Sequence, residues 1–227
     1  MSDFENRTNT ADRFVERMKQ YYWKTIEIEG ENIHMHEYGY ENFIDKEMMN
    51  ILRTRRSNTA KFIRYAPDYI LCSDKKEMLL EYKVTKTPRY TFKELQWDRG
   101  QIEADAFDNY VNLSKAKIEI AVLIYCPYHT YPVLCGIPDR NWVIGERQRT
   151  YHSSGSGTEF YNIDLNKMEH FDVFMNKYFG ISHIESQKLL MKMLIEIKKD
   201  EGLQTVHARN SYCNDGKHLT GFNWKLI

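Results

Sequence analysis

The sequence predicts a mixed α/β protein in which a central sheet is flanked by helices. Segments with helical and strand-like patterns follow one another along the chain, an order typical of layered α/β folds. The run 117–127, KIEIAVLIYCP, is almost continuously apolar, as expected of a strand covered on both faces. With 42% hydrophobic and 14% aromatic residues, the 227-residue chain is expected to form one domain, 1–227, with a core at about 10–140 and a helical C-terminal elaboration at about 141–227.

The first element is expected to be a helix from about Ala11 to Lys24. Phe14, Met18 and Tyr22 recur every four residues, which is the spacing of one helix face, and Thr10 can cap the beginning.

Residues 25–39 alternate weakly between apolar and polar types and are expected to form an irregular strand pair. His34 and His36 would share one face of such a strand. They are either a metal-binding pair or part of a plain surface strand, because no carboxylate or cysteine completes a zinc spacing in the sequence. A short helix within 40–58, ending in a basic cluster, is expected to follow.

A β-hairpin is predicted from Phe62–Cys72 and Met78–Val84, joined by the turn SDKK. After a loop, residues 101–115 are predicted to form a helix that leads into the apolar strand. A further strand at 130–138 contains Pro132, which favours an edge position.

The C-terminal part is expected to be mostly helical. Ser153–Gly157 has the composition of a short mobile loop. A capping box at Asn166 opens a helix that Gly180 ends, and a second box at Ser182 opens a long helix that ends near Gly202.

Charge and cysteine content narrow the function classes. Lys plus Arg and Asp plus Glu both number 32, so the net charge is zero and a nucleic-acid partner would have to be held by local patches. Four cysteines without CxxC spacing are expected to be reduced and structural, which suits a cytoplasmic protein. No run approaches the ~18 apolar residues of a membrane span, so we expect a soluble intracellular protein without a membrane partner.

The predicted hairpin carries a set of charged residues on one face. Side chains two apart along a strand point the same way, so Glu81 and Lys83 share a face, and pairing of the strands brings Asp68 towards them. The two carboxylates and the backbone carbonyl of Tyr82 are hard oxygen ligands of the kind that binds Mg²⁺. Lys83 could orient or deprotonate an attacking water, or stabilise charge in the transition state.

These residues resemble the catalytic motif of the PD-(D/E)XK nuclease superfamily. Pro67-Asp68 is followed after twelve residues by Glu81-Tyr82-Lys83. Members of that superfamily generally place a helix with a glutamate before the motif, and a helix and a buried strand after it, as this sequence does.

The resemblance implies a restriction-endonuclease-like core and a metal-dependent deoxyribonuclease that hydrolyses DNA with a metal-activated water, as an endonuclease in preference to an exonuclease. Mg²⁺ would be the cofactor, with Mn²⁺ as a substitute. By the same analogy Asp68, Glu81 and the Tyr82 carbonyl bind metal, Lys83 acts on the water, and Glu16 completes the metal site. A homodimer is a further implication.

The helix after the motif fits the resemblance in part. Some branches carry a glutamine and a tyrosine about one turn apart on this helix; Tyr110 matches the tyrosine, but Ala106 stands at the glutamine position. Gln101 is retained as a candidate for contact with substrate or water.

Basic residues flank the motif on both sides and are candidates for phosphate contacts: Arg53, Arg55, Arg56, Lys61, Arg64, Lys86 and Arg89. Such residues form a solvated face equally often, and both interpretations remain open. The alternative function is a catalytically inactive nucleic-acid-binding or structural protein on the same fold.

Overall fold

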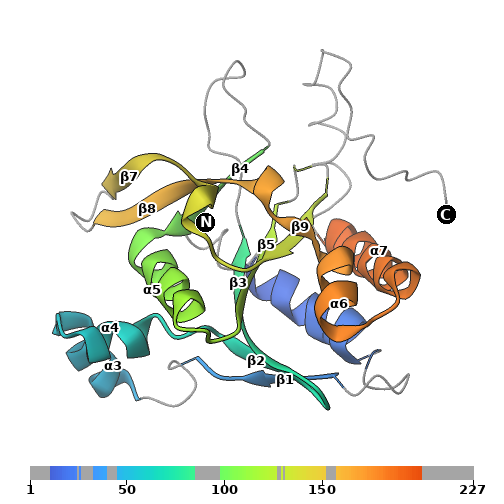
Figure 1. Ribbon diagram of the computed structural model, residues 1–227, viewed down its shortest axis with the longest axis horizontal. Helices are drawn as coiled ribbons and strands as arrows, with labels where there is room; N and C mark the ends of the chain where they lie inside the picture. The colour runs from blue at the N-terminus through green and yellow to red at the C-terminus, as the bar shows by residue number, and fades with distance from the viewer. Residues whose placement is uncertain are drawn as a thin grey trace.

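The predicted central mixed sheet flanked by helices is confirmed by a computed structural model. It describes residues 11–24, 26, 33–39, 45–84, 98–126, 129, 131–151 and 157–200. In this part of the chain a six-stranded sheet has the order β1-β2-β3-β5-β6-β9, and a three-stranded sheet has the order β4-β8-β7 (Figure 1).

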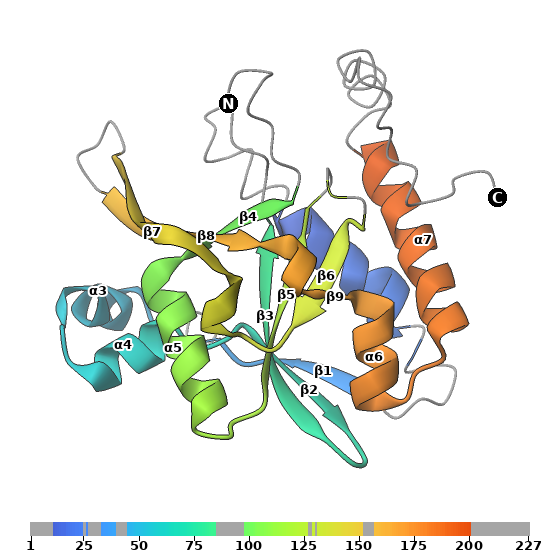
Figure 2. The same ribbon diagram turned by 45° about the horizontal axis from the view of Figure 1, so that its top comes forward.

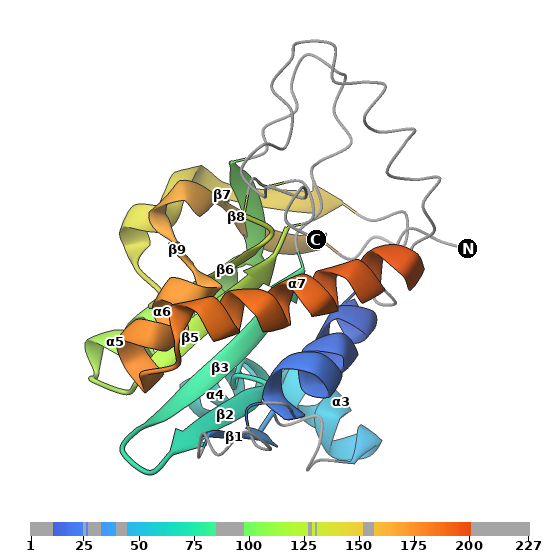
Figure 3. The same cartoon turned by 90° about the vertical axis from the view of Figure 1, so that its right-hand side faces the viewer.

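The first helix is present as predicted and covers one face of the main sheet. Residues 11–17 are α-helical, and Met18–Trp23 form the π-helical segment η1. The ring of Phe14 stacks on Tyr125 with 4.6 Å between centroids, and its buried side chain places this helix against the sheet. Figure 3 shows this blue helix beside the C-terminal helix α7.

Three antiparallel strands follow the first helix. They are β1 (Ile33–Glu37), β2 (Tyr69–Ser73) and β3 (Glu77–Val84), with β2 in the centre. The chain then passes through α5 (Ala104–Lys115) and returns as β5 (Ile120–Tyr125), which lies parallel to β3. The resemblance implied a helix before the hairpin and a helix and a buried strand after it, and these elements are present, with β4 (Arg99–Glu103) inserted before α5.

The other side of the sheet is completed by short strands. Antiparallel to β5 lies β6 (Val133–Gly136), and β9 (Glu169–His170) pairs with its outer side. The prediction that the strand after Pro132 forms an edge is therefore wrong, because β9 covers it.

Two short helices interrupt the path from β1 to β2. They are α3 (Lys46–Thr54) and α4 (Asn58–Arg64), and Asp45 and Ser57 cap them by accepting backbone N–H groups. The predicted strand from Phe62 is therefore corrected: Ser57 starts a helix that includes Phe62, and extended structure begins only after Pro67.

The small sheet is the largest departure from the sequence prediction. It contains β4 (Arg99–Glu103), β7 (Val143–Tyr151) and β8 (Gly157–Asp164), with the 3₁₀ turn η4 (Arg140–Trp142) leading into β7. Residues 101–103 are thus strand and not helix, because they pair with β8. Figure 2 shows this sheet on the same side of the molecule as α5.

The C-terminal helices lie against the first helix and the outer strands. They are α6 (Phe171–Phe179) and α7 (His183–Asp200), and Gly180 ends α6 with a φ of 74°, as predicted. The predicted helix start at Asn166 is wrong: residues 165–167 form a 3₁₀ turn, η5, in which Asp164 accepts the N–H of Asn166, and β9 intervenes before α6.

The main sheet separates two apolar cores. Leu71, Leu80 and Leu123 belong to the core under the first helix, α6 and α7. Ile120 and Val122 belong to the core under α5 and the small sheet. Because Glu81 pairs with Val122 in the β3–β5 register, its side chain lies on the α5 face.

Some predictions lie outside the described residues. These are the loop at 153–156, the end of the last helix at Gly202, and the candidate residues Lys86 and Arg89. Within the described part, none of the helices has the length and apolar character needed to cross a membrane. Cys126 and Cys135 are buried and are not disulfide-bonded, as expected of structural thiols.

Candidate active site

The β2–β3 hairpin brings Asp68 and Glu81 to the same row of the sheet. Tyr69 pairs with Leu80 and Ile70 with Leu79, so the same register continued by one residue places Asp68 opposite Glu81. The backbone carbonyl of Asp68 accepts the N–H groups of Tyr38 and Gly39 at 2.8 and 3.0 Å, which fixes the chain at this point. The juxtaposition expected from strand pairing is therefore present.

Glu81 is a carboxylate almost fully removed from solvent. It is only 2% exposed, and its Oε1 forms an ion pair with Nζ of Lys83. Its Oε2 is buried and makes no hydrogen bond of standard geometry among the described residues, although the hydroxyl of Tyr110 lies close enough to interact with the Glu81 carboxylate. A buried carboxylate oxygen without a partner costs free energy, so this atom is available for a cation or donor that completes its coordination.

Lys83 is surrounded by acidic groups. Burial alone would lower the pKa of its ammonium group, but the charges of Glu81 and Asp68, contact with Glu81 and the charge of Glu103 together raise this pKa to about 12. Lys83 is therefore a cation at neutral pH when its neighbours are ionised. This favours charge stabilisation or water orientation over proton abstraction by the lysine.

Two further residues approach Glu81 and Lys83: Tyr110 from α5, and Glu103 from the last position of β4. Tyr110 is 2% exposed, and burial together with the charge of Glu81 raises the pKa of its hydroxyl well above the ordinary value. Burial raises the pKa of Glu103, whereas the nearby charge of Lys83 lowers it. The sequence analysis placed Tyr110 near the motif but overlooked Glu103, which stands at the junction of β4 and α5.

Glu103 was missed because the sequence contains no local signal for it. It was included in a predicted helix of ordinary amphipathic pattern, and its approach to Lys83 depends on the pairing of β4 with β8. An acidic residue 20 positions after the lysine is too common to stand out. The turn from β4 into α5 aims it at the site.

Glu16 and Gln101 are positioned differently from the core of the motif. Glu16 is exposed on the first helix, whose buried residues pack on the opposite face of the sheet from Glu81. Gln101 lies on β4, where its Nε2 donates to Oδ1 of Asn162 at 3.4 Å. The contacts recorded for the described residues do not link Glu16 to Glu81 or Lys83, so its metal-binding role remains a prediction, as does substrate contact by Gln101.

The basic residues before the motif lie on the α3–α4 helix pair. Arg53, Arg55, Arg56 and Lys61 are exposed, whereas Arg64 is partly buried and donates from Nη1 to the backbone carbonyl of Arg53 at 3.2 Å. Because α4 ends at Arg64, the chain reaches Asp68 only four residues later. The exposed positive charges are therefore attached directly to the strand that carries an acidic site residue.

Hydrogen bonds attach this connection to α5. Asn109 donates its amide to the backbone carbonyl of Tyr65 at 3.0 Å, and the hydroxyl of Tyr65 donates to Asp105 at 3.4 Å. A movement of the α3–α4 pair would therefore be transmitted to the helix that carries Tyr110.

The donor set suits a hard divalent cation, although it is incomplete. Asp68 and Glu81 supply carboxylate oxygens, and the unpartnered Oε2 of Glu81 is the atom that most needs a ligand. Among the described residues no three His, Cys, Asp or Glu side chains are close enough to hold a metal ion by themselves. A cation at this point would be completed by the Tyr82 carbonyl, water or a phosphate oxygen.

Comparison with solved structures gives a likeness in fold. No protein-family model and no curated protein sequence matches the chain. The structure of Hjc, a Holliday junction resolvase from the archaeal hyperthermophile Archaeoglobus fulgidus, is similar with a TM-score of 0.35 and 11% sequence identity, over 68% of this chain and 94% of that one.

Proposed function

We propose that the protein is a Mg²⁺-dependent nuclease that hydrolyses phosphodiester bonds in DNA, with Asp68, Glu81 and Lys83 at its centre. One observation carries the proposal: Glu81 is a buried carboxylate with an unpartnered oxygen, held beside a lysine and in register with a second acid. Burial of such a charge is costly, and a purely structural hairpin has no need of it.

The chemistry of each of the three side chains gives it a different role in the proposed reaction. Asp68 and Glu81 would hold the cation with the Tyr82 carbonyl. When bound, Mg²⁺ would polarise the phosphate and favour deprotonation of the attacking water. Lys83, protonated and fixed by Glu81, supplies a positive charge that can orient water or stabilise the negative charge that accumulates on the phosphate oxygens.

The α3–α4 helix pair supports a nucleic-acid substrate. Its exposed arginines and lysine provide charges that contact phosphates without reading sequence. Their short connection to Asp68 would place a bound strand near the acidic residues. DNA and the preference for endonucleolytic cutting come from the resemblance to PD-(D/E)XK enzymes, and RNA is the substrate to test against it.

Cleavage assays with matched variants test this function. Purified protein is incubated with supercoiled, linear, single-stranded and four-way-junction DNA, and with RNA, in Mg²⁺, Mn²⁺ or EDTA. We expect cleavage of DNA that needs the divalent ion and is lost at least 100-fold in Asp68→Asn, Glu81→Gln and Lys83→Met.

The control is Glu119→Gln, an identical acid-to-amide change next to β5, where Glu119 forms only a surface ion pair with Lys76 at 3.2 Å. This variant should cut like the parent. Equal cleavage by parent and Glu81→Gln would refute the site. Binding of DNA and Mn²⁺ without cleavage of any substrate would instead indicate the catalytically inactive alternative.

A further inference from the structure

A second group of metal-ligating side chains lies on the same sheet face as Glu81, nearer the tip of the β2–β3 hairpin. His34 and His36 stand two residues apart on β1, and β2 pairs His34 directly with Cys72. The sequence separates Cys72 from His34 by 38 positions, so only the antiparallel pairing of β1 with β2 reveals the combination.

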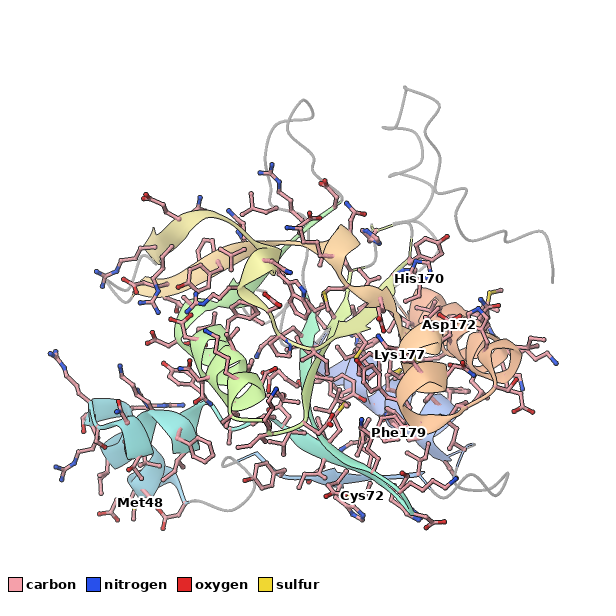
Figure 4. The ribbon with its side chains drawn as sticks, in the orientation of Figure 1. Met48, Cys72, His170, Asp172, Lys177 and Phe179 are labelled. Carbon is pink, nitrogen blue, oxygen red and sulfur yellow. The ribbon has the colours of Figure 1, made fainter. Side chains whose placement is uncertain are left out.

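The three side chains are accessible. His34 and His36 are exposed and Cys72 is partly buried, and these residues belong to the edge strand β1 and its neighbour β2. Figure 4 shows Cys72 on the lower part of β2, well away from His170 and Asp172 near α6. A metal ion can therefore reach this part of the sheet from solvent.

Strand geometry allows the three side chains to converge. Directly opposite residues of an antiparallel pair have Cβ atoms about 5 Å apart, and residues two apart on one strand point the same way. The rings of His34 and His36 have centroids 6.2 Å apart and are inclined by 37°. Two imidazoles bound to one tetrahedral zinc at about 2.0 Å have ring centres about 5 Å apart, so an approach of about 1 Å is needed.

We expect rotation of the imidazole side chains to supply that approach. No three such side chains among the described residues converge on a metal position as they stand. The imidazoles of His34 and His36 are exposed and can turn about their side-chain torsions without moving the backbone. The strand pairing already supplies the positions of the three ligands.

The ligand chemistry selects a different metal from the one proposed for Asp68 and Glu81. Two imidazoles and a thiolate are borderline-soft and soft donors, a Cys-His₂ set that suits Zn²⁺ and leaves a fourth position open. Mg²⁺ prefers carboxylate, carbonyl and water oxygens. Cys72 and Asp68 are four residues apart along the chain, a separation of roughly 13 Å, whereas His36 pairs with Ile70, two residues or roughly 7 Å from Asp68.

We propose that His34, His36 and Cys72 form a zinc site on the edge of the main sheet, separate from the acidic site. Its ligands join β1 to β2 near the hairpin tip. The proposal does not depend on nuclease activity, because it rests on the pairing of His34 with Cys72 and on the soft character of the ligands.

Cobalt spectroscopy tests the site without any activity assay. Protein stripped with EDTA and kept reduced is titrated with Co²⁺. One equivalent should produce a thiolate-to-cobalt charge-transfer band and the strong visible bands of four-coordinate cobalt, and Zn²⁺ should abolish both. A hundredfold excess of Mg²⁺ should leave them unchanged.

Variants assign the ligands. Cys72→Ser should lose the charge-transfer band, and His34→Ala or His36→Ala should weaken Co²⁺ binding at least tenfold, with circular dichroism confirming that each variant is folded. Cys213→Ser is the matched thiol control and should keep the band, as should Asp68→Asn. A band that survives Cys72→Ser, a band lost in Cys213→Ser, unchanged affinity in both histidine variants, or no band in the parent would overturn the proposal.

Discussion

Replacement of Lys83 by methionine tests how the buried charges of the acidic site are balanced. Lys83→Met keeps most of the aliphatic volume and removes the ammonium group that pairs with Glu81. The remaining carboxylate of Glu81 is 2% exposed and loses its main counter-charge. We therefore expect the variant to be less stable than the parent, because a buried carboxylate is left without its counter-charge.

The expected loss of folding stability in Lys83→Met follows from the pKa of Lys83 in the parent. Its rise from the ordinary 10.5 to about 12 means that the folded environment prefers the charged form by roughly 2 kcal/mol. Leaving one member of a buried pair without its partner typically costs about 3–5 kcal/mol. We therefore expect Lys83→Met to lose about 3 kcal/mol at pH 8.

In the parent protein, a pH dependence of stability arises from the titration of Lys83 itself. The folded-state pKa of Lys83 is raised, so its stabilising contribution is complete below the unfolded-state value near 10.5 and is lost as the pH rises towards 12. Between pH 7 and 10 the parent should therefore show no loss of stability from this group.

Urea unfolding followed by tryptophan fluorescence, in EDTA, gives the free energy of unfolding at pH 8. The matched control is the double variant Glu81→Gln with Lys83→Met, which removes both charges and should recover about half of the loss or more at pH 8. If Lys83→Met is as stable as the parent at pH 8, or if the double variant is less stable than the single one, the reasoning about the buried pair is wrong.

Three other predictions concern packing and titration outside the acidic site. The hydroxyl groups of Tyr22 and Ser186 share a buried hydrogen bond of 2.7 Å, so Tyr22→Phe should cost about 1–2 kcal/mol in urea unfolding, and combining it with Ser186→Ala should cost less than the sum of the two. A Cβ on Gly136 would stand 2.8 Å from the ring of Trp142, so Gly136→Ala should lower the free energy of unfolding by about 1–3 kcal/mol and Trp142→Phe in the same chain should reduce that loss. Burial lowers the pKa of His170, so the unfolded state binds more protons below pH 7 and His170→Gln should flatten the fall in stability from pH 7 to pH 5.

The part of the fold that sequence could predict is the part with strong local patterns. The centre of the apolar run became β5, which is buried along its whole length, and the four-residue spacing of Phe14 and Met18 correctly predicted the first helix. The side-chain parity of Glu81 and Lys83 was also correct, because alternation within one strand is a local property.

The secondary-structure predictions were wrong where pairing with a distant strand, or the capping of a helix, overrides the local composition. Gln101 to Glu103 have an ordinary helical pattern, yet they pair with β8, 57 to 61 residues away in the β4–β8 register, and this contact makes them a strand. Phe62 looked like the start of a strand, but the cap at Ser57 begins a helix there. Glu103 was not predicted to lie near the site for the same reason. Its position near Lys83 depends on the pairing of β4, and no spacing along the chain predicts that pairing.

The rows of one sheet face explain why two chemically different metal sites can coexist on one hairpin. Along β2, Asp68 and Cys72 point the same way and are separated by Ile70, whose cross-strand partners are His36 and Leu79. Ile70 and Leu79 place apolar side chains between the carboxylates and the thiol. A hard cation bound by Asp68 and Glu81 is therefore not in reach of the thiolate, and a soft cation at Cys72 is not in reach of those two carboxylates, although the carboxylate of Glu77 stands directly opposite Cys72 on β3. The Ile70→Asp substitution would introduce a hard ligand between the two groups. We expect this substitution to broaden the metal preference of the group formed by His34, His36 and Cys72. Mn²⁺ should then compete with Co²⁺ in the spectroscopic titration. Unchanged selectivity in Ile70→Asp would show that the separation of the two groups depends on distance alone.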